Sequence, residues 1–304
     1  MTDSLLVVGS VAFDTIETRA GKRTEILGGA ATFIALAASH FCPVNLVAVV
    51  GEHDFPEEHT RLLAARGVDL EGLERAPGRT FRWSGVYAED FLSRRTLDTQ
   101  LGVFESFDPK LPTPYLASRF LMLGNIHPAL QLKVLEAMRG RAFVIADTMN
   151  LWIQTTPDVL WKLIERVDLL VINDEEACLL TGERQLVVAA ERLRHRGPRA
   201  LIIKRGEHGA YLFADKTTFF APALPLREVV DPTGAGDTFA GGLAGYLASR
   251  KETSVEAMKT GMLYGAALAS LKVEVFGPET LARVDRSTID RRVEQLRTLV
   301  ALPR

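Results

Sequence analysis

The sequence has few cysteines. Only Cys42 and Cys178 occur among its 304 residues, which excludes a disulfide framework. The two do not form a CxxC pair, and the six histidines are scattered along the chain. The sequence therefore offers no cluster with zinc-ligand spacing, and we expect both cysteines to be structural.

An excess of basic residues is also missing. The chain has 36 Lys and Arg against 38 Asp and Glu, so its formal net charge is −2. Nucleic acids and anionic membranes are usually bound through a basic surplus or basic runs, so neither is expected as the main partner. No run of about 18 apolar residues is present to span a bilayer. The start, "MTDSLLVVGS", lacks the basic and long apolar segments of a signal peptide, and we expect a cytoplasmic protein.

What the sequence does contain is an alternation of short apolar runs and helical patterns. Apolar runs at 4–10 and 44–51 flank an Ala-rich helical stretch at 28–41. This order predicts a parallel sheet with helices on both faces. Further strands are expected at 119–125, 142–147, 167–173 and 200–206, and a further helix at 56–68. Ligands of such sheets bind at the carboxyl ends of strands, and four of these ends carry Asn125, Asp147, Asn173 and Gly206.

Two stretches break this pattern. Residues 11–27 and 79–98 alternate polar and apolar side chains and are rich in aromatic and β-branched residues. Such alternation is typical of antiparallel hairpins, and the first stretch is expected to turn at Gly21-Lys22. We interpret both as a small β appendage on the α/β chain.

The most informative stretch is "VVDPTGAGDTFAGG", residues 229–242. A glycine-rich loop that enters a helix exposes backbone N–H groups at the positive end of the helix dipole, which makes an anion site. Asp237 at this helix start has two interpretations. It is either an ordinary first-turn acid, worth about 1 kcal/mol, or a base facing a hydroxyl group while the N–H groups hold a transferring phosphate.

The string from Asp231 to Phe239, "DPTGAGDTF", resembles the C-terminal signature of the ribokinase-like (PfkB) carbohydrate kinases. Gly28-Gly29 before a small-residue helix resembles the N-terminal signature, and "NDEE" at 173–176 resembles the Asn-x-x-Glu motif. The resemblance covers residues 1–304 as a single kinase domain. It implies a three-layer α/β/α fold with a mostly parallel sheet and a β-sheet lid at about 11–27 and 79–102. It also implies ATP-dependent phosphorylation of a hydroxyl group, without the GxxxxGK[ST] loop of P-loop enzymes.

The resemblance assigns roles around the nucleotide. Asp237 would be the catalytic base, and the N–H groups of Gly234, Ala235 and Gly236 the anion hole. Glu176 would organise Mg²⁺, largely through water, as Mg²⁺ commonly requires. Asp231 and Thr233, with backbone carbonyls near Lys272, Val275 and Gly277, match the place where some members bind K⁺. The ATP-binding residues would be Asn173, Lys204, Gly206, Gly209 and Thr233.

The acceptor site is assigned in the same way. Its residues would be Asp14, Gly28, Gly29, Phe33, Arg82, Asn125 and Asn150. Ribokinases typically carry Lys and Asn after the two glycines, whereas this chain has Ala30 and Phe33. A sugar or polyol is the leading acceptor class, and a nucleoside is the alternative because these changes remove polar contacts and add an aromatic surface.

Two functions from other classes stay open. A non-catalytic ligand sensor on the same fold would not need to keep Asp237 and the complete glycine loop. A nicotinamide dehydrogenase would need GxGxxG after the first strand, where "GSVAFD" stands instead. An exposed lid sheet also predicts a homodimer formed through its face or edge.

Overall fold

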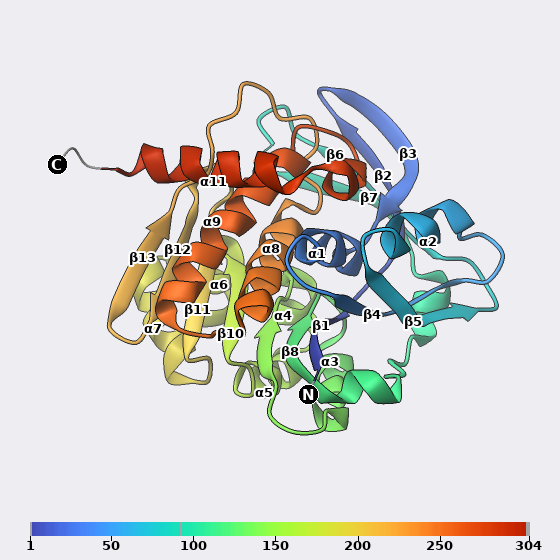
Figure 1. Ribbon diagram of the computed structural model, residues 1–304, viewed down its shortest axis with the longest axis horizontal. Coiled ribbons are helices and arrows are strands. Elements are labelled where there is room, and N and C mark those ends of the chain that lie inside the picture. Colours follow the sequence, from blue (N-terminus) through green and yellow to red (C-terminus); the bar gives the residue numbers. More distant parts are fainter. Residues whose placement is uncertain (1, 92, 302–304) are drawn as a thin grey trace.

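The computed structural model describes residues 2–91 and 93–301, and a nine-stranded sheet runs through its centre (Figure 1). The ends of the predicted domain and Leu92 of the predicted lid lie outside the described residues. The strands from β11 to β5 are parallel, and β12 and β13 join one edge in antiparallel orientation. In spatial order the strands are β13 (Thr217–Ala221), β12 (Ala210–Ala214), β11 (Ala200–Lys204), β10 (Leu169–Asn173), β9 (Phe143–Ala146), β8 (Ser118–Leu123), β1 (Thr2–Val8), β4 (Val44–Gly51) and β5 (Val68–Ala76).

Helices cover both faces of this sheet (Figure 1). The central strand β1 shows why, because successive side chains of a strand point to opposite faces. Leu5 and Val7 belong to one buried cluster, and Leu6 and Val8 belong to the other. The helices are α1 (Ala30–Ala38), α2 (Glu57–Ala64), α3 (Pro128–Ala137), α4 (Asn150–Thr155), α5 (Pro157–Ile164), α6 (Asp174–Thr181), α7 (Leu186–His195), α8 (Ala235–Arg250), α9 (Val255–Lys272), α10 (Glu279–Arg283) and α11 (Arg286–Leu299).

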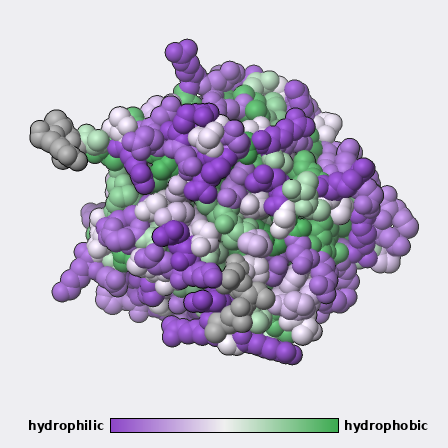
Figure 2. Space-filling model, viewed as in Figure 1, coloured by the Kyte–Doolittle hydropathy of each residue, from purple (hydrophilic) through white to green (hydrophobic). Residues whose placement is uncertain are grey.

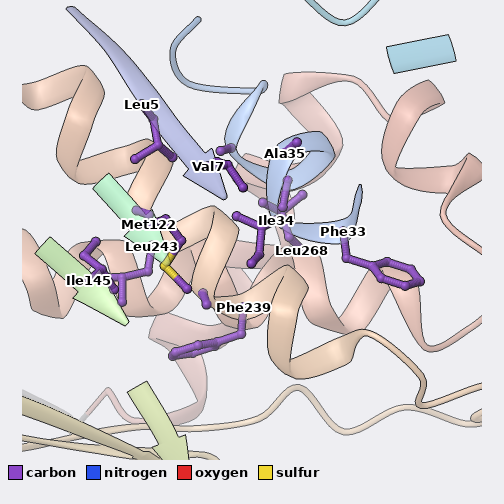
Figure 3. Packing of buried hydrophobic residues seen from close by; sticks show 14 of the residues in the cluster. Leu5, Val7, Phe33, Ile34, Ala35, Met122, Ile145, Phe239, Leu243 and Leu268 are labelled. Carbon is purple, nitrogen blue, oxygen red and sulfur yellow. The ribbon is translucent and has the colours of Figure 1, made fainter. Parts of the chain in front are cut away.

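The small residues of α1 and α8 allow these two helices to touch backbone to backbone. A Cβ added to Gly241 would lie 2.4 Å from the Ile34 carbonyl oxygen, and one added to Gly245 would lie 2.6 Å from Ala38 Cα. Figure 3 shows Ile34 and Leu243 meeting Val7 and Met122 of the sheet in the resulting core. This packing holds the start of α8 against the sheet.

A second, four-stranded sheet, here called the small sheet, lies beside the first (Figure 1). The two predicted hairpins form, but the strands that join them, β2 and β6, pair in parallel. The first hairpin turns at Arg19-Ala20, two residues before the predicted position. In spatial order the small sheet contains β3 (Gly21–Gly28), β2 (Ala12–Thr18), β6 (Phe81–Tyr87) and β7 (Arg94–Gln100).

The sequence patterns missed two edge strands. The helix expected at 56–68 ends at Ala64, and Val68 begins β5, which carries charged residues and Gly72. The other is β13, where buried and exposed side chains do not form a continuous apolar run. Edge strands have one free side, so their sequences are less apolar than those of central strands.

Hydrophilic side chains cover most of the face shown in Figure 2, with hydrophobic ones scattered between them. Of the helices in the described ranges, none combines the length and the hydropathy needed to cross a membrane.

Candidate active site

The glycine loop opens α8 as the sequence predicts. Gly234 is the N-cap, with a φ of 73° that favours glycine, and its carbonyl accepts a hydrogen bond from the Thr238 N–H at 2.8 Å. The Ala235 N–H differs from the prediction, because it already donates to the Pro232 carbonyl at 3.1 Å. Within the described residues, the N–H groups of Gly236 and Asp237 have no backbone acceptor. Within the same residues the Gly234 N–H also has no acceptor, so the free donors at the positive end of the helix are those of Gly234, Gly236 and Asp237.

Asp237 lies in the first turn of α8, half-buried and next to other charges. Burial, followed by the charge of Asp147, raises the pKa of its carboxyl to about 6, against the opposing effects of Lys204 and Arg94. Across residues 2–91 and 93–301, no group donates a hydrogen bond to this carboxylate. It is therefore free to accept one from a bound hydroxyl group, and its pKa suits a general base near neutral pH.

Lys204 connects the glycine loop to the end of strand β9. Its Nζ lies 3.4 Å from Asp147 Oδ2, and a Cβ added to Gly236 would lie 3.1 Å from the same Nζ. Burial lowers the pKa of Lys204, but Asp147, Glu176 and Asp237 outweigh it and raise the pKa overall. The ammonium thus stays charged beside the free N–H groups of the loop.

Asn173 and Glu176 form a reciprocal capping box at the start of α6. Asn173 Oδ1 accepts from the Glu176 N–H at 2.7 Å, and Glu176 Oε2 accepts from the Asn173 N–H at 2.8 Å. Burial, then the charge of Asp147, raises the pKa of Glu176 to about 8. The capping box accounts for the Asn-x-x-Glu motif locally. It does not account for the three carboxylates, those of Asp147, Glu176 and Asp237, that act on Lys204. Within the described residues, no group of three or more His, Cys, Asp or Glu side chains is placed to hold a metal ion directly, and the role of Glu176 toward Mg²⁺ through water stays a prediction.

Asp14 and the glycine pair meet at the edge of the small sheet. A Cβ on Gly28 would lie 2.0 Å from Asp14 Oδ2, so only glycine leaves room for this carboxylate. Burial, then the charge of Asp231, raises the pKa of Asp14 to about 7, while the Gly29 N–H and Lys272 oppose the shift. Asp237 also contributes to this shift, so the two aspartates lie in one electrostatic neighbourhood.

Phe33 is placed differently from the rest of the predicted acceptor site. It is 2% exposed, and a Cβ on Gly234 would lie 2.4 Å from its ring. In Figure 3 its ring points away from the other labelled core residues. Phe33 supports the glycine loop from the core side, and its contact with an acceptor stays a prediction.

Asp231 does not fit a bound K⁺. The Lys272 ammonium lies 2.5 Å from Asp231 Oδ2 and 2.9 Å from the Asp231 carbonyl oxygen, with Val275 O at 3.4 Å. The side chains of Asp231 and Lys272 are both fully buried. A lysine thus occupies the place where the sequence predicted the cation.

Arg82 is held by the small sheet and its neighbours. Its Nε donates to Glu25 Oε1 and its Nη1 donates to Asp54 Oδ2, both at 2.8 Å, and Nη1 also reaches the Thr80 carbonyl. Its guanidinium lies over the Phe13 ring at 5.2 Å. These contacts explain Arg82 as a structural residue, and its acceptor role stays a prediction.

Asn125 and Asn150 lie at the carboxyl ends of β8 and β9. Asn125 Oδ1 accepts from Trp152 Nε1 at 2.9 Å, and the Trp152 ring meets His127 edge to face. The Oδ1 of Asn150 is buried without a partner in the described residues. An unpaired buried acceptor is costly, so it suits a ligand donor.

Three further nucleotide predictions lie around the same edge. Gly206 and Gly209 have positive φ values of 52° and 80°, and a Cβ on Gly209 would lie 2.3 Å from the Ala221 carbonyl oxygen. Thr233 donates its hydroxyl to the Tyr87 hydroxyl at 3.1 Å. The positive φ values account for glycine at both positions. The contacts of Gly206, Gly209 and Thr233 with ATP stay predictions.

Arg94 and Tyr87 of the small sheet are residues that the sequence patterns missed. The Arg94 guanidinium lies over the Trp83 ring at 5.4 Å, and its charge opposes the rise in the pKa values of Asp237 and Glu176. Thr18 adds a contact from the small sheet to the loop, because its hydroxyl donates to the Val230 carbonyl at 2.8 Å. Arg94 carries no sequence signal, since it is one of two adjacent arginines on an exposed strand.

The comparisons with known proteins agree with this geometry. The model of the pfkB family carbohydrate kinases matches residues 2–283. The chain belongs to this family. It is a phosphotransferase that moves a phosphoryl group from ATP to a hydroxyl group of a sugar or a nucleoside.

Three relatives illustrate the range of this kinase family. A cytidine kinase from Thermococcus kodakarensis is 33% identical over 265 residues, which cover 85% of this chain and 93% of the relative. The nucleoside kinase of Burkholderia thailandensis in complex with inosine is 25% identical, with a TM-score of 0.75 over 95% of this chain and 96% of that one. A Vibrio cholerae fructokinase with fructose, ADP and calcium ion is 17% identical, with a TM-score of 0.76 over 95% and 98%. The predicted ribokinase-like fold is confirmed.

Replacing Arg94 with Gln is expected to reduce kcat/KM of this kinase roughly 10- to 100-fold, because a positive charge that acts on Asp237 and Glu176 is lost. Arg95→Gln is the matched control, since neighbouring strand residues point to opposite faces. Steady-state kinetics of both variants test this. Equal losses of kcat/KM in the Arg94→Gln and Arg95→Gln variants would show that the overall positive charge of β7, rather than the position of Arg94, supports activity.

Proposed function

We propose that this kinase phosphorylates a hydroxyl group of a nucleoside. The observation that carries the proposal is the 33% identity to a cytidine kinase along most of both chains. The site supports a neutral acceptor, because Arg82 is already bonded to Glu25 and Asp54 and would not be free for an acidic sugar. The Asn125–Trp152 pair offers an amide and a large aromatic surface beside the strand ends.

The chemistry would proceed from the residues around α8. The acceptor hydroxyl group lies between Asp14 and Asp237, and Asp237 takes its proton as the phosphoryl group moves in line. The free N–H groups of Gly236 and Asp237, with Lys204 and Arg94, stabilise the charge on the transferring group. Mg²⁺ bound with ATP would neutralise phosphate charge, and Glu176 would hold it through water.

The small sheet would act as a lid. Its contacts with the loop at Thr18 and Tyr87 support this role, because they join the small sheet to the site. Closure would keep water from being phosphorylated.

The small sheet also offers a surface for the predicted homodimer. Its outer strand β7 is exposed and includes the exposed Leu97, so a second copy of the chain would pack there. Sedimentation measurements of the molecular mass test this prediction. The cytoplasmic location also stays a prediction.

The test is a panel of acceptors with Mg²⁺ and ATP, followed by release of ADP. Cytidine, uridine, inosine and adenosine are compared with ribose, fructose and myo-inositol, and mass spectrometry identifies the product. We expect a kcat/KM for one or more nucleosides roughly 100-fold above any free sugar, because the base adds binding that a sugar lacks.

A higher kcat/KM for a free sugar or polyol would instead establish the alternative acceptor class. Turnover of that sugar or polyol would still depend on Asp237. The result would therefore contradict the nucleoside acceptor but not the kinase activity.

A further inference from the structure

Lys272 is the last residue of α9, and its side chain is completely buried. Burying an ammonium is unfavourable unless partners replace its water shell. Here the partners come from two segments, one before α8 in the sequence and one after α9. They are Asp231, just before the glycine loop, and Val275, just after α9.

The contacts account for every proton of the ammonium. An ammonium has three N–H donors, and three oxygens accept from it: Asp231 Oδ2 at 2.5 Å, Asp231 O at 2.9 Å and Val275 O at 3.4 Å. Burial lowers the pKa of Lys272, while the charge of Asp231 and its hydrogen bond oppose this shift. A neutral amine has only two donors, so the three contacts match the charged form. The ring of Phe33 adds a cation–π contact at 5.6 Å.

The same aspartate organises the backbone that leads into the glycine loop. Asp231 Oδ1 accepts from the Thr233 N–H at 2.8 Å, and Asp231 Oδ2 accepts from the Gly277 N–H at 3.4 Å. The N–H groups of Val230 and Asp231 both donate to the Val273 carbonyl. Movement of Asp231 would therefore move the start of α8, where the free N–H donors and Asp237 lie.

We infer that the Lys272 ammonium is a built-in cation that takes the place of a monovalent metal ion, so that this kinase works without K⁺ and Lys272 positions the glycine loop. Both a bound K⁺ and an ammonium carry one positive charge and need a shell of oxygens. Only one of them can lie between Asp231 and Val275. Lys272 is a positioning residue, since it acts on the reaction through Asp231 and the loop.

The first test uses the unaltered protein. Its kcat/KM and its melting temperature are measured in K⁺, Na⁺ and tetramethylammonium chloride at equal ionic strength. We expect the same values in all three salts. Selective activation or stabilisation by K⁺ would overturn the inference, and the melting temperature reports this whatever the acceptor proves to be.

The second test empties the site with Lys272→Ala. In tetramethylammonium we expect kcat/KM to fall at least roughly tenfold through misplacement of the loop. K⁺ or NH₄⁺ should restore part of the activity and raise the melting temperature in a saturable way. Lys259→Ala on the same helix is the control, since Lys259 pairs with an exposed Glu256 and should show no such rescue.

A folded Lys272→Ala protein with full activity, or one that neither K⁺ nor NH₄⁺ rescues, would overturn the positioning role. If this variant does not fold, Lys272→Met fills the space without charge. The Lys272→Met protein should fold and lose activity, and neither K⁺ nor NH₄⁺ should restore it. Full activity of this variant would also overturn the inference.

Discussion

Asp237→Asn is expected to lower kcat roughly 10²- to 10⁴-fold, the usual contribution of a general base. The amide keeps the shape of the side chain but cannot take the proton of the acceptor. Binding of ATP should persist, because Lys204 and the free N–H groups of the loop remain. Turnover is measured by ADP release, and nucleotide binding by calorimetry.

The stability of this variant separates a catalytic role from misfolding. The raised pKa of Asp237 means that the folded protein holds this proton more tightly than the unfolded chain. The wild type therefore loses stability as pH rises from about 4 to about 6, by up to about 3 kcal/mol. Asp237→Asn escapes this loss, so it should melt above the wild type at pH 8 and close to it at pH 4.

In the wild type, kcat/KM should fall as pH drops through about 6, because the base becomes protonated. Asp158→Asn is the control, since Asp158 is also a first-turn acid, on the exposed start of α5. It should keep full activity. Near-normal turnover in Asp237→Asn would remove Asp237 from the mechanism.

Gly234→Ala is expected to lower the free energy of unfolding by roughly 2–4 kcal/mol and to reduce activity strongly. Alanine is strained at a φ of 73°, and its Cβ would lie 2.4 Å from the buried Phe33 ring. The ring cannot move without disturbing the core. Chemical denaturation and ADP release measure the two effects.

Gly182→Ala is a closely matched control for the backbone strain. Gly182 ends α6 with a φ of 71°, and nothing lies within 4 Å of its added Cβ. It should cost only the strain, roughly 1–2 kcal/mol, and leave kcat unchanged. Equal destabilisation by both substitutions would show that contact with Phe33 is not significant.

Much of the site follows from local patterns. The strand ends at Asn125 and Asn173 and the glycine loop before α8 could be predicted because short apolar runs and glycines act over a few residues. Edge strands β5 and β13 could not, since partial exposure weakens their apolar signal. The hydrogen bond of the Ala235 N–H to Pro232 depends on how the loop closes, which composition does not encode.

The family, the α/β architecture and Asp237 as the candidate base could be predicted from the amino-acid sequence, because they depend on a contiguous string and on hydrophobic periodicity. Three relations became visible only in the folded chain: Lys272 meets Asp231, the charge of Arg94 acts on Asp237, and Phe33 lies against the glycine loop. The reason is that charges interact through space. Lys272 is 41 residues from Asp231 in the chain but in hydrogen-bond contact in the fold, and a buried charge is stable only where folding delivers its partner.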